Sequence, residues 1–195
     1  MIYKNLYIIG NGFDQHHDIQ CSFLNFMEWI KENDASLFFK LTQVYNSAWE
    51  YNWWRDFENS LAQLNINYYA NKKGNLYDPE YIKDGSMEEK TEKTNQKVIE
   101  EFDKIKESLR QDFQKWLSEA YEKRPKEKKI QFPSEGSIFL TFNYTKTLED
   151  IYEIDAKRVY HIHGVIEDKD SMVVGHGLGE EELNDMLKCH EPRIG

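Results

Sequence analysis

The sequence has few cysteines, no long apolar run and no excess of positive charge. Two cysteines, Cys21 and Cys189, are too few for a disulfide framework or a zinc site with four cysteine ligands. The longest apolar run near the start, Leu6–Ile9, is much shorter than the core of a signal peptide or a membrane span. A balance of 25 basic against 35 acidic side chains gives a net charge of −10, which argues against a general nucleic-acid binder because phosphate contacts need clustered Lys and Arg. We therefore expect a cytoplasmic protein with no structural metal, no membrane contact and no nucleic-acid partner.

The composition that remains is that of a folded globular chain. Hydrophobic residues make up 39% of the sequence and aromatic residues 14%, more than a disordered chain would carry. A length of 195 residues allows one ordinary domain, or one domain with a sizeable insertion.

Four β-rich runs predict the strands: residues 3–9, 137–142, 158–162 and 171–174. The first of them is a continuous apolar run that meets a glycine turn at Gly10. Such a pattern is typical of a buried parallel strand that leads into a helix.

Apolar side chains at helical spacing predict helices from Ser22 to about Lys31, over residues 37–45 and over residues 53–64. The clearest periodicity, with steps of three and four over residues 98–120, predicts a long helix. Residues 65–85 have the composition of a loop. We interpret four tryptophans on these helical faces as packing of a core or a lid rather than a stacking platform: Trp49, Trp53, Trp54 and Trp116.

A short helix is predicted after the second strand. Thr147 and Asp150 have the spacing of a capping box, and Leu148, Ile151 and Tyr152 would then face inward. The element order is β-α, a helical block, then β-α-β-β. It predicts a single α/β domain over residues 1–195, with a mainly parallel sheet and a helical insertion over residues 33–130.

Polar clusters follow three of the predicted strands: Gly10–Asp14, Asn143–Thr145 and His161–Gly164. In an open parallel sheet such strand ends line the crevice in which ligands bind. Each cluster alone has a plainer interpretation. The glycines could form a tight turn, since Gln15 replaces the third glycine of the dinucleotide fingerprint, Asn143 could start a helix, and His163 could be a structural histidine.

The three clusters together favour a site for a ribonucleotide. An amide such as that of Asn143 can orient a water or a ribose hydroxyl, and a histidine such as His163 is a base that titrates near neutrality. Backbone N–H groups at Gly10 and Gly12 are suited to a phosphate.

A metal site is the weaker interpretation of the histidines. His16 and His17 point about 100° apart on a helix and have no histidine partner at i+4 spacing, so Asp14 with these two side chains makes a poor ligand set. His176 follows a predicted strand, and we expect it to face the nucleotide crevice.

Four blocks of sequence resemble the AbiH family of bacterial phage abortive-infection proteins, in the order of the family and over most of the chain. They are Leu6–Asp14 (LYIIGNGFD), Trp54–Glu58 (WRDFE), Phe139–Thr145 (FLTFNYT) with Leu148–Glu149, and His161–Gly164 (HIHG). The resemblance implies a role in antiviral defence against phage, set off by a phage trigger that the sequence does not name.

A more distant similarity is to sirtuin-like NAD-binding domains, including the NAD hydrolases of phage defence. It rests on the order of a Gly-x-Gly loop, a Thr-x-Asn-Tyr segment and a His-Gly pair. It implies a Rossmann-like fold with NAD as substrate or ligand and no metal, in which Asn143 and His163 are the catalytic pair. The implied cofactor-binding residues are Gly10, Asn11, Gly12, Asp14, Thr141, Tyr144, Gly164 and His176.

The chain departs from both families. Phe13–Asp14 stands where sirtuins have a small residue and Ser, and the cysteine-rich zinc module is lacking, so protein deacylation is not implied. AbiH proteins usually continue into another strand and a closing helix, whereas this sequence ends at Pro192–Gly195. We expect the C-terminal part of the family fold to be absent, with a homo-oligomer or a completing partner chain as the way to complete it.

Three functions follow as hypotheses. The first is a hydrolase that cleaves the nicotinamide–ribose bond of NAD. The second is a non-catalytic regulatory module that binds NAD or a related nucleotide. The third is a metal-dependent nuclease effector centred on Asp14, His16 and His176.

Overall fold

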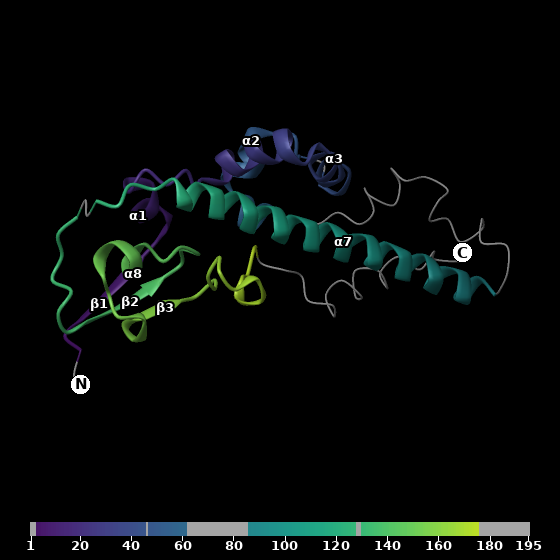
Figure 1. Ribbon diagram of the computed structural model, residues 1–195. Coiled ribbons are helices and arrows are strands. Elements are labelled where there is room, and N and C mark those ends of the chain that lie inside the picture. Colours follow the sequence, from purple (N-terminus) through teal and green to yellow (C-terminus); the bar gives the residue numbers. More distant parts are fainter. Residues whose placement is uncertain (1–2, 46, 62–85, 128–129, 176–195) are drawn as a thin grey trace. The chain divides into compact units, whose positions relative to one another are not determined.

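The computed structural model describes residues 3–45, 47–61, 86–127 and 130–175 (Figure 1). These residues divide between two compact units. The first unit contains the residues up to Trp29 together with Arg110–Val174, and the second contains the described residues between Ile30 and Leu109, with Gly175. None of the described helices carries an apolar stretch that could cross a bilayer.

The first unit is built on a three-stranded parallel sheet in the order β1-β2-β3. The strands are β1 (Asn5–Ile9), β2 (Ser137–Thr141) and β3 (Val159–His161). Ile9 lies opposite Thr141, and Thr141 lies opposite His161, so the three strands end in one row. The predicted α/β class and the parallel pairing of these three runs are therefore confirmed.

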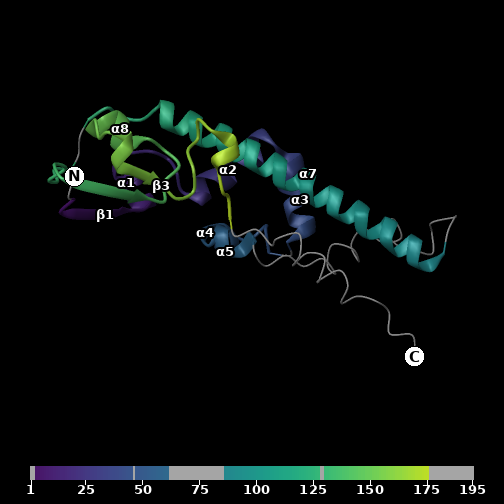
Figure 2. The same ribbon diagram turned by 90° about the horizontal axis from the view of Figure 1, so that it is seen from below.

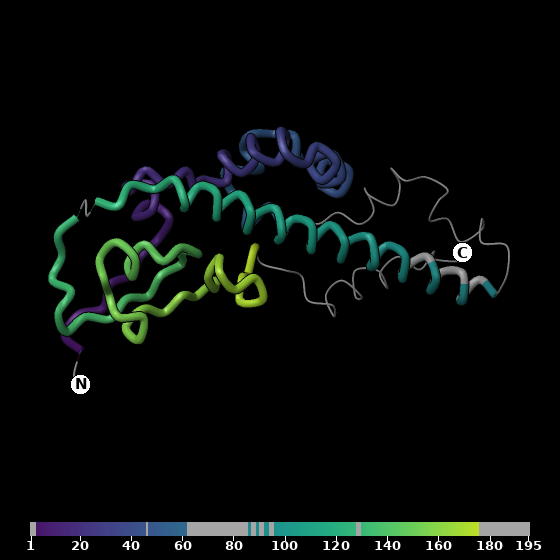
Figure 3. The backbone as a smooth tube through the Cα atoms, in the orientation of Figure 1, coloured from purple at the N-terminus to yellow at the C-terminus, as the bar shows by residue number. Residues whose placement is uncertain are grey.

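Helices follow the strands as the apolar runs predicted. β1 leads through Gly10 into α1 (Asn11–His16), and β2 leads into α8 (Thr147–Tyr152), as the path of the backbone in Figure 3 shows. One face of the sheet is covered by a core that contains Phe139 and Val159 from the strands and Leu148 and Ile154 from α8 and the residues after it. This arrangement fixes α1 and α8 at the carboxyl ends of their strands.

A second apolar cluster in the first unit joins the start of α2 (Phe23–Asn33) to the end of α7 (Met87–Glu122). The Phe26 and Phe113 rings meet edge to face with centroids 5.2 Å apart, and Phe113 also contacts the ring of Tyr144 at 5.1 Å. The two views in Figures 1 and 2 both show the start of α2 beside the C-terminal end of α7. Tyr144 is thereby anchored close to the end of β2.

The second unit consists of helices. Besides its parts of α2 and α7 it contains α3 (Ala35–Val44), α4 (Tyr51–Arg55) and α5 (Phe57–Leu61). The predicted helices at 22–31, 37–45 and 98–120 are confirmed, and the last is extended to 36 residues. The predicted loop 65–85 lies outside the described residues.

The predicted helix 53–64 is interrupted, because the chain forms α4 and α5 with a break at Asp56, and residues 62–64 lie outside the described residues. The backbone of Asp56 has φ −116° and ψ 47°, which is not helical. Its side chain accepts a hydrogen bond from Asn59 Nδ2 at 2.8 Å, and short polar side chains of this kind compete with the helical backbone. The helical spacing of Trp53, Trp54 and Phe57 is kept because their rings pack on one another across the break.

Two further predictions fail for local reasons. Trp49 is not a packing residue: it lies in a turn rather than on a helical face and is 66% exposed, whereas Trp53, Trp54 and Trp116 are buried. Residues 171–174 do not form a strand. The Val173 carbonyl accepts from the Tyr144 hydroxyl at 2.7 Å, so a side chain takes the place of a neighbouring strand.

Candidate functional site

Three chain segments leave the sheet at the carboxyl ends of its parallel strands. They start at Gly10 after β1, at Phe142 after β2 and at Ile162 after β3, in the row where Ile9, Thr141 and His161 lie opposite one another. The structure thus brings the three predicted polar clusters to one edge of the sheet, the edge at which parallel α/β sheets bind ligands.

A buried carboxylate, that of Asp14, connects α1 to the segment after β2. Asp14 is 2% exposed. Its Oδ2 accepts from the Thr145 hydroxyl at 2.5 Å, and its Oδ1 accepts from the Thr147 hydroxyl at 2.8 Å. Burial raises the pKa of Asp14 above its ordinary value, while the hydrogen bonds of the two threonines oppose that rise because they favour the charged form.

The contact of Thr147 with Asp14 replaces the predicted capping box. The first residue of α8 is Thr147 itself, the cap position is Lys146, and no side-chain cap hydrogen bond forms there. Thr147 is 1% exposed. A hydrogen bond from its buried hydroxyl to a buried carboxylate stabilises the fold more than a hydrogen bond to the local helix end would. Leu148 and Ile151 face inward as predicted, and Tyr152 is partly buried.

Asn143 is a buried polar residue at this edge. The residue is 6% exposed, and its backbone N–H donates to Thr141 Oγ1 at 3.1 Å. Its side-chain amide lowers the pKa of Asp14, yet Nδ2 has no hydrogen-bond partner among the described residues. The amide therefore lies beside the carboxylate, near enough to act on its pKa as a hydrogen-bond donor, but without the geometry of a full hydrogen bond.

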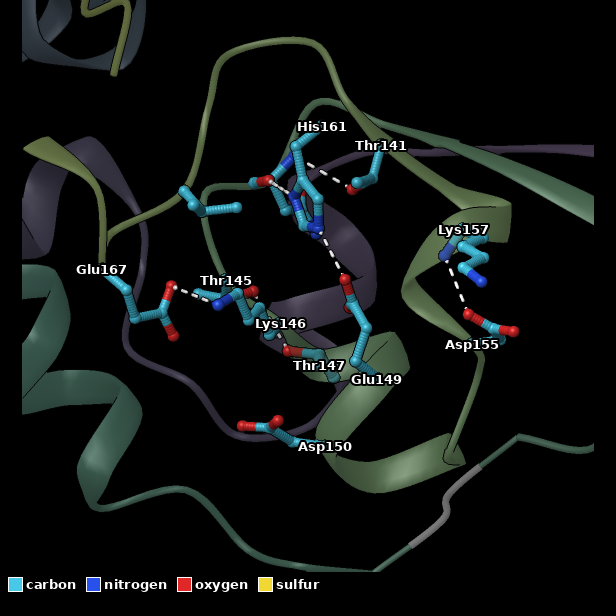
Figure 4. Close-up of polar contacts among 12 residues, drawn as sticks. Thr141, Thr145, Lys146, Thr147, Glu149, Asp150, Asp155, Lys157, His161 and Glu167 are labelled. Atoms are coloured by element: carbon cyan, nitrogen blue, oxygen red, sulfur yellow. Dashed lines mark hydrogen bonds and ion pairs between the residues drawn. The ribbon is translucent and has the colours of Figure 1, made fainter. Parts of the chain in front are cut away.

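His161 holds the backbone of Asn143 in place. Its Nδ1 lies 3.1 Å from the carbonyl oxygen of Asn143, which can only accept, so Nδ1 carries a proton. Its Nε2 lies 2.9 Å from Oε1 of Glu149 on α8, and Figure 4 shows the ring directed at that carboxylate. The side chains of His161 and Glu149 are only 11% and 14% exposed, so solvent screens the pair weakly.

The pKa of His161 is raised above its ordinary value of 6.5. Burial acts to lower it, but the hydrogen bonds to Glu149 and to the Asn143 carbonyl, together with the charges of Glu149 and Glu167, outweigh that effect. The protonated imidazole can donate at both nitrogens, which is the arrangement that the two acceptors demand. Glu167 itself pairs with Lys146 at 3.4 Å, and this contact is also drawn in Figure 4.

His163 lies beside the same segment. Its ring packs against Phe142 with centroids 5.5 Å apart and against Tyr144 at 5.7 Å, the two residues that flank Asn143. The carbonyl oxygen of His163 accepts from the Val173 N–H at 3.0 Å. The structure therefore places His163 next to the chain position of Asn143.

The glycines divide into two kinds. A Cβ added to Gly10 or Gly12 would meet nothing within 4 Å, so these positions are open to an approaching molecule. Gly164 has φ +79°, and a Cβ there would lie 2.1 Å from the carbonyl oxygen of Ser171. Gly164 is required by the turn after β3, whatever else it contacts.

Several predicted site residues already have protein partners. The amide of Asn11 donates to the Cys21 carbonyl at 3.2 Å and accepts from the Cys21 thiol at 2.7 Å. The Tyr144 hydroxyl is bound to Val173, and Thr141 Oγ1 accepts from the Asn143 N–H. His176 lies outside the described residues.

The histidines of α1 differ in their surroundings. His17 is fully buried, with Nδ1 donating to the Phe13 carbonyl at 2.7 Å and Nε2 at 2.8 Å from the Tyr152 hydroxyl, whereas His16 is exposed. In the part of the chain that the structure describes, no three His, Cys, Asp or Glu side chains are grouped so that they could hold a metal ion.

Sequence reasoning placed Thr145 and His161 in the polar clusters but assigned them no role, and it missed the roles of Glu149 and Thr147 at this edge. One signal was available, because His161 ends a strand within the HIHG block while Glu149 lies on the helix after the preceding strand. The pairing itself depends on tertiary contacts that spacing does not reveal.

A family described as "Bacteriophage abortive infection AbiH" has a sequence model that matches residues 6–192. This range includes all three strand-end segments. No curated protein and no solved structure matches the chain.

Proposed function

This chain belongs to the AbiH family, which implies a role in abortive infection, and we propose that it acts there by binding NAD or a related nucleotide and hydrolysing the nicotinamide–ribose bond. In this proposal the parallel sheet is the centre of a Rossmann-like, sirtuin-like nucleotide domain. The nucleotide lies at the carboxyl ends of β1, β2 and β3.

The observation that carries the proposal is the amide of Asn143. Its Nδ2 is buried without a hydrogen-bond partner among the described residues. A buried donor without a full hydrogen bond costs up to about 1–3 kcal/mol, and the neighbouring Asp14 carboxylate offsets part of that cost. A group kept at that cost beside a ligand-binding strand end is a candidate for a contact that forms only with substrate.

The catalytic roles follow from the chemistry of the two side chains. Asn143 would donate to a ribose hydroxyl or orient the attacking water. His163 would accept a proton from the ribose or from that water as general base. The water oxygen forms a bond to C1′ of the ribose, the bond from C1′ to the nicotinamide nitrogen breaks, and the nicotinamide leaves as a neutral base with that electron pair.

The surrounding groups would support rather than perform the reaction. The open backbone at Gly10 and Gly12 would accommodate the pyrophosphate, with Asn11 and Asp14 on the ribose side. The remaining predicted contacts, Thr141, Tyr144, Gly164 and His176, would complete the nucleotide site.

Release of nicotinamide from NAD tests the proposal. We expect purified protein to release it, and we expect Asn143→Ala and His163→Ala each to lower the rate at least about 100-fold, since positioned proton transfer contributes that much. Asn59→Ala is the matched control, because Asn59 bonds Asp56 in the second unit. It should keep the full rate.

Three results separate the hypotheses. Hydrolysis that survives both substitutions would contradict the assigned site. Saturable NAD binding without product, with loss of binding in Asn143→Ala alone, would favour a non-catalytic regulatory module. Cleavage of nucleic acid that depends on added metal would favour the nuclease.

A further inference from the structure

One face of the sheet carries seven apolar side chains, of which five are exposed and two are half-buried. We call it the open sheet face. Ile8 is 66% exposed, Leu6 58% and Tyr160 53%, high values for strand residues of a parallel sheet. The seven residues are Leu6, Ile8, Ile138, Leu140, Phe142, Tyr160 and Ile162.

The strand register shows that these side chains form one continuous surface. Leu6 lies opposite Ile138, and Ile8 lies opposite Leu140, which in turn lies opposite Tyr160. Side chains alternate along a strand, so these positions share a face, and their odd-numbered neighbours such as Phe139 belong to the covered core. All seven side chains are apolar or aromatic, and none is charged.

Such a surface needs a cover. Parallel sheets occur almost only with both faces buried, and soluble monomers rarely expose apolar patches above a few hundred Å². From the exposed fractions, the open sheet face presents on the order of 600 Å², so two copies would bury about 1,200 Å² together, the lower end of the range for specific interfaces.

We propose that the open sheet face binds the same face of a second copy of this chain. A twofold dimer of this kind brings an identical patch from each copy into contact, the commonest arrangement of homo-oligomers. The net charge of −10 makes two copies repel each other, and an uncharged face is where they approach at the lowest electrostatic cost. The proposal does not depend on NAD chemistry.

Sedimentation equilibrium of the full chain tests the proposal. We expect a mass of twice 23.4 kDa at tens of micromolar protein. Ile8→Glu should raise the dissociation constant at least 100-fold, because it places a charge within the apolar face, next to Leu140 of the central strand. Phe39→Glu is the matched control: Phe39 is 63% exposed on α3 in the second unit, and its substitution should leave the mass unchanged.

Hydroxyl-radical labelling of the unmodified protein gives a test that does not depend on a variant's folding. Labelling of Tyr160 should fall as the protein concentration rises through the dimerisation range, while labelling of Trp49, which is 66% exposed, should not change. A monomer at 100 µM, a dimer that persists in folded Ile8→Glu, equal dissociation of Phe39→Glu, or unprotected Tyr160 in the dimer would each overturn the proposal.

Discussion

Asp14 and the threonines that bind it decide how the candidate site is held together. The carboxyl is buried with two hydroxyl donors, and its pKa is raised because burial disfavours the charge more than the donors favour it. Thr145 and Thr147 thus fix the chain after β2 to α1, and Asn143 lies within the segment that they fix.

Removing one donor should destabilise the fold. Thr147→Val keeps the shape of the side chain but deletes the hydroxyl that donates to Asp14 Oδ1. We expect the free energy of unfolding to fall by about 1–3 kcal/mol, because a buried acceptor loses its partner. Urea denaturation at pH 7 measures this. Thr42→Val, which removes a hydroxyl whose hydrogen bond to the Phe39 carbonyl is exposed, should change stability by less than about 0.5 kcal/mol. Equal effects of the two substitutions would contradict the account.

The pair of His161 and Glu149 should make stability depend on pH. The folded-state pKa of His161 lies above 6.5, so the stabilisation is complete below pH 6.5 and is lost as pH rises through the raised pKa. The stability difference between the natural protein and Glu149→Gln should be largest at pH 5.5 to 6.5 and should shrink above it.

Asp103→Asn is the control for the pH experiment. It removes a carboxylate from an exposed pair with Lys106, whose contact solvent screens. Its stability difference should stay flat between pH 5.5 and 8.5. If the stability difference for Glu149→Gln were also independent of pH, His161 and Glu149 would not form the hydrogen-bonded ion pair in solution.

At the scale of elements, the two kinds of glycine predict opposite effects. Gly164→Ala puts a methyl group 2.1 Å from the Ser171 carbonyl oxygen at a positive φ, so we expect a loss of about 2 kcal/mol or more. Gly12→Ala lies in α1 with open space around it and should leave stability unchanged or raise it by up to about 1 kcal/mol.

The same pair of variants separates structure from binding. If Gly12 lies against the pyrophosphate, Gly12→Ala should be fully folded by circular dichroism and yet bind NAD at least tenfold more weakly in calorimetry. Unchanged NAD affinity in the folded variant would argue against a phosphate at this turn.

Sequence patterns predicted the elements well where one periodic signal dominates. The apolar run that ends at Gly10 identified β1, and the steps of three and four in residues 98–120 identified α7. The patterns failed where a polar side chain could form either a local hydrogen bond or one with a residue distant in sequence. Thr147 binds Asp14, distant in sequence, instead of capping α8, and Tyr144 takes the carbonyl that a strand at residues 171–174 would have used. Such choices depend on tertiary neighbours.

For the whole molecule, membership of the AbiH family implies a role in abortive infection. The open sheet face predicts that the protein dimerises in solution. If a second copy covers that face, the thermal midpoint should rise with protein concentration, since association stabilises the folded state by mass action. Ile8→Glu should remove this dependence. A midpoint that does not change between 1 and 100 µM in the natural protein would contradict dimerisation.

In the proposed function the buried amide of Asn143 binds the nucleotide. NMR of that amide tests this binding most directly. With the side-chain N–H₂ resonances assigned, the account predicts that NAD shifts those of Asn143 in a saturable way and leaves those of Asn59, which already bind Asp56, unchanged. Asn143 signals that stay in place at millimolar NAD, or shifts confined to other residues, would contradict it.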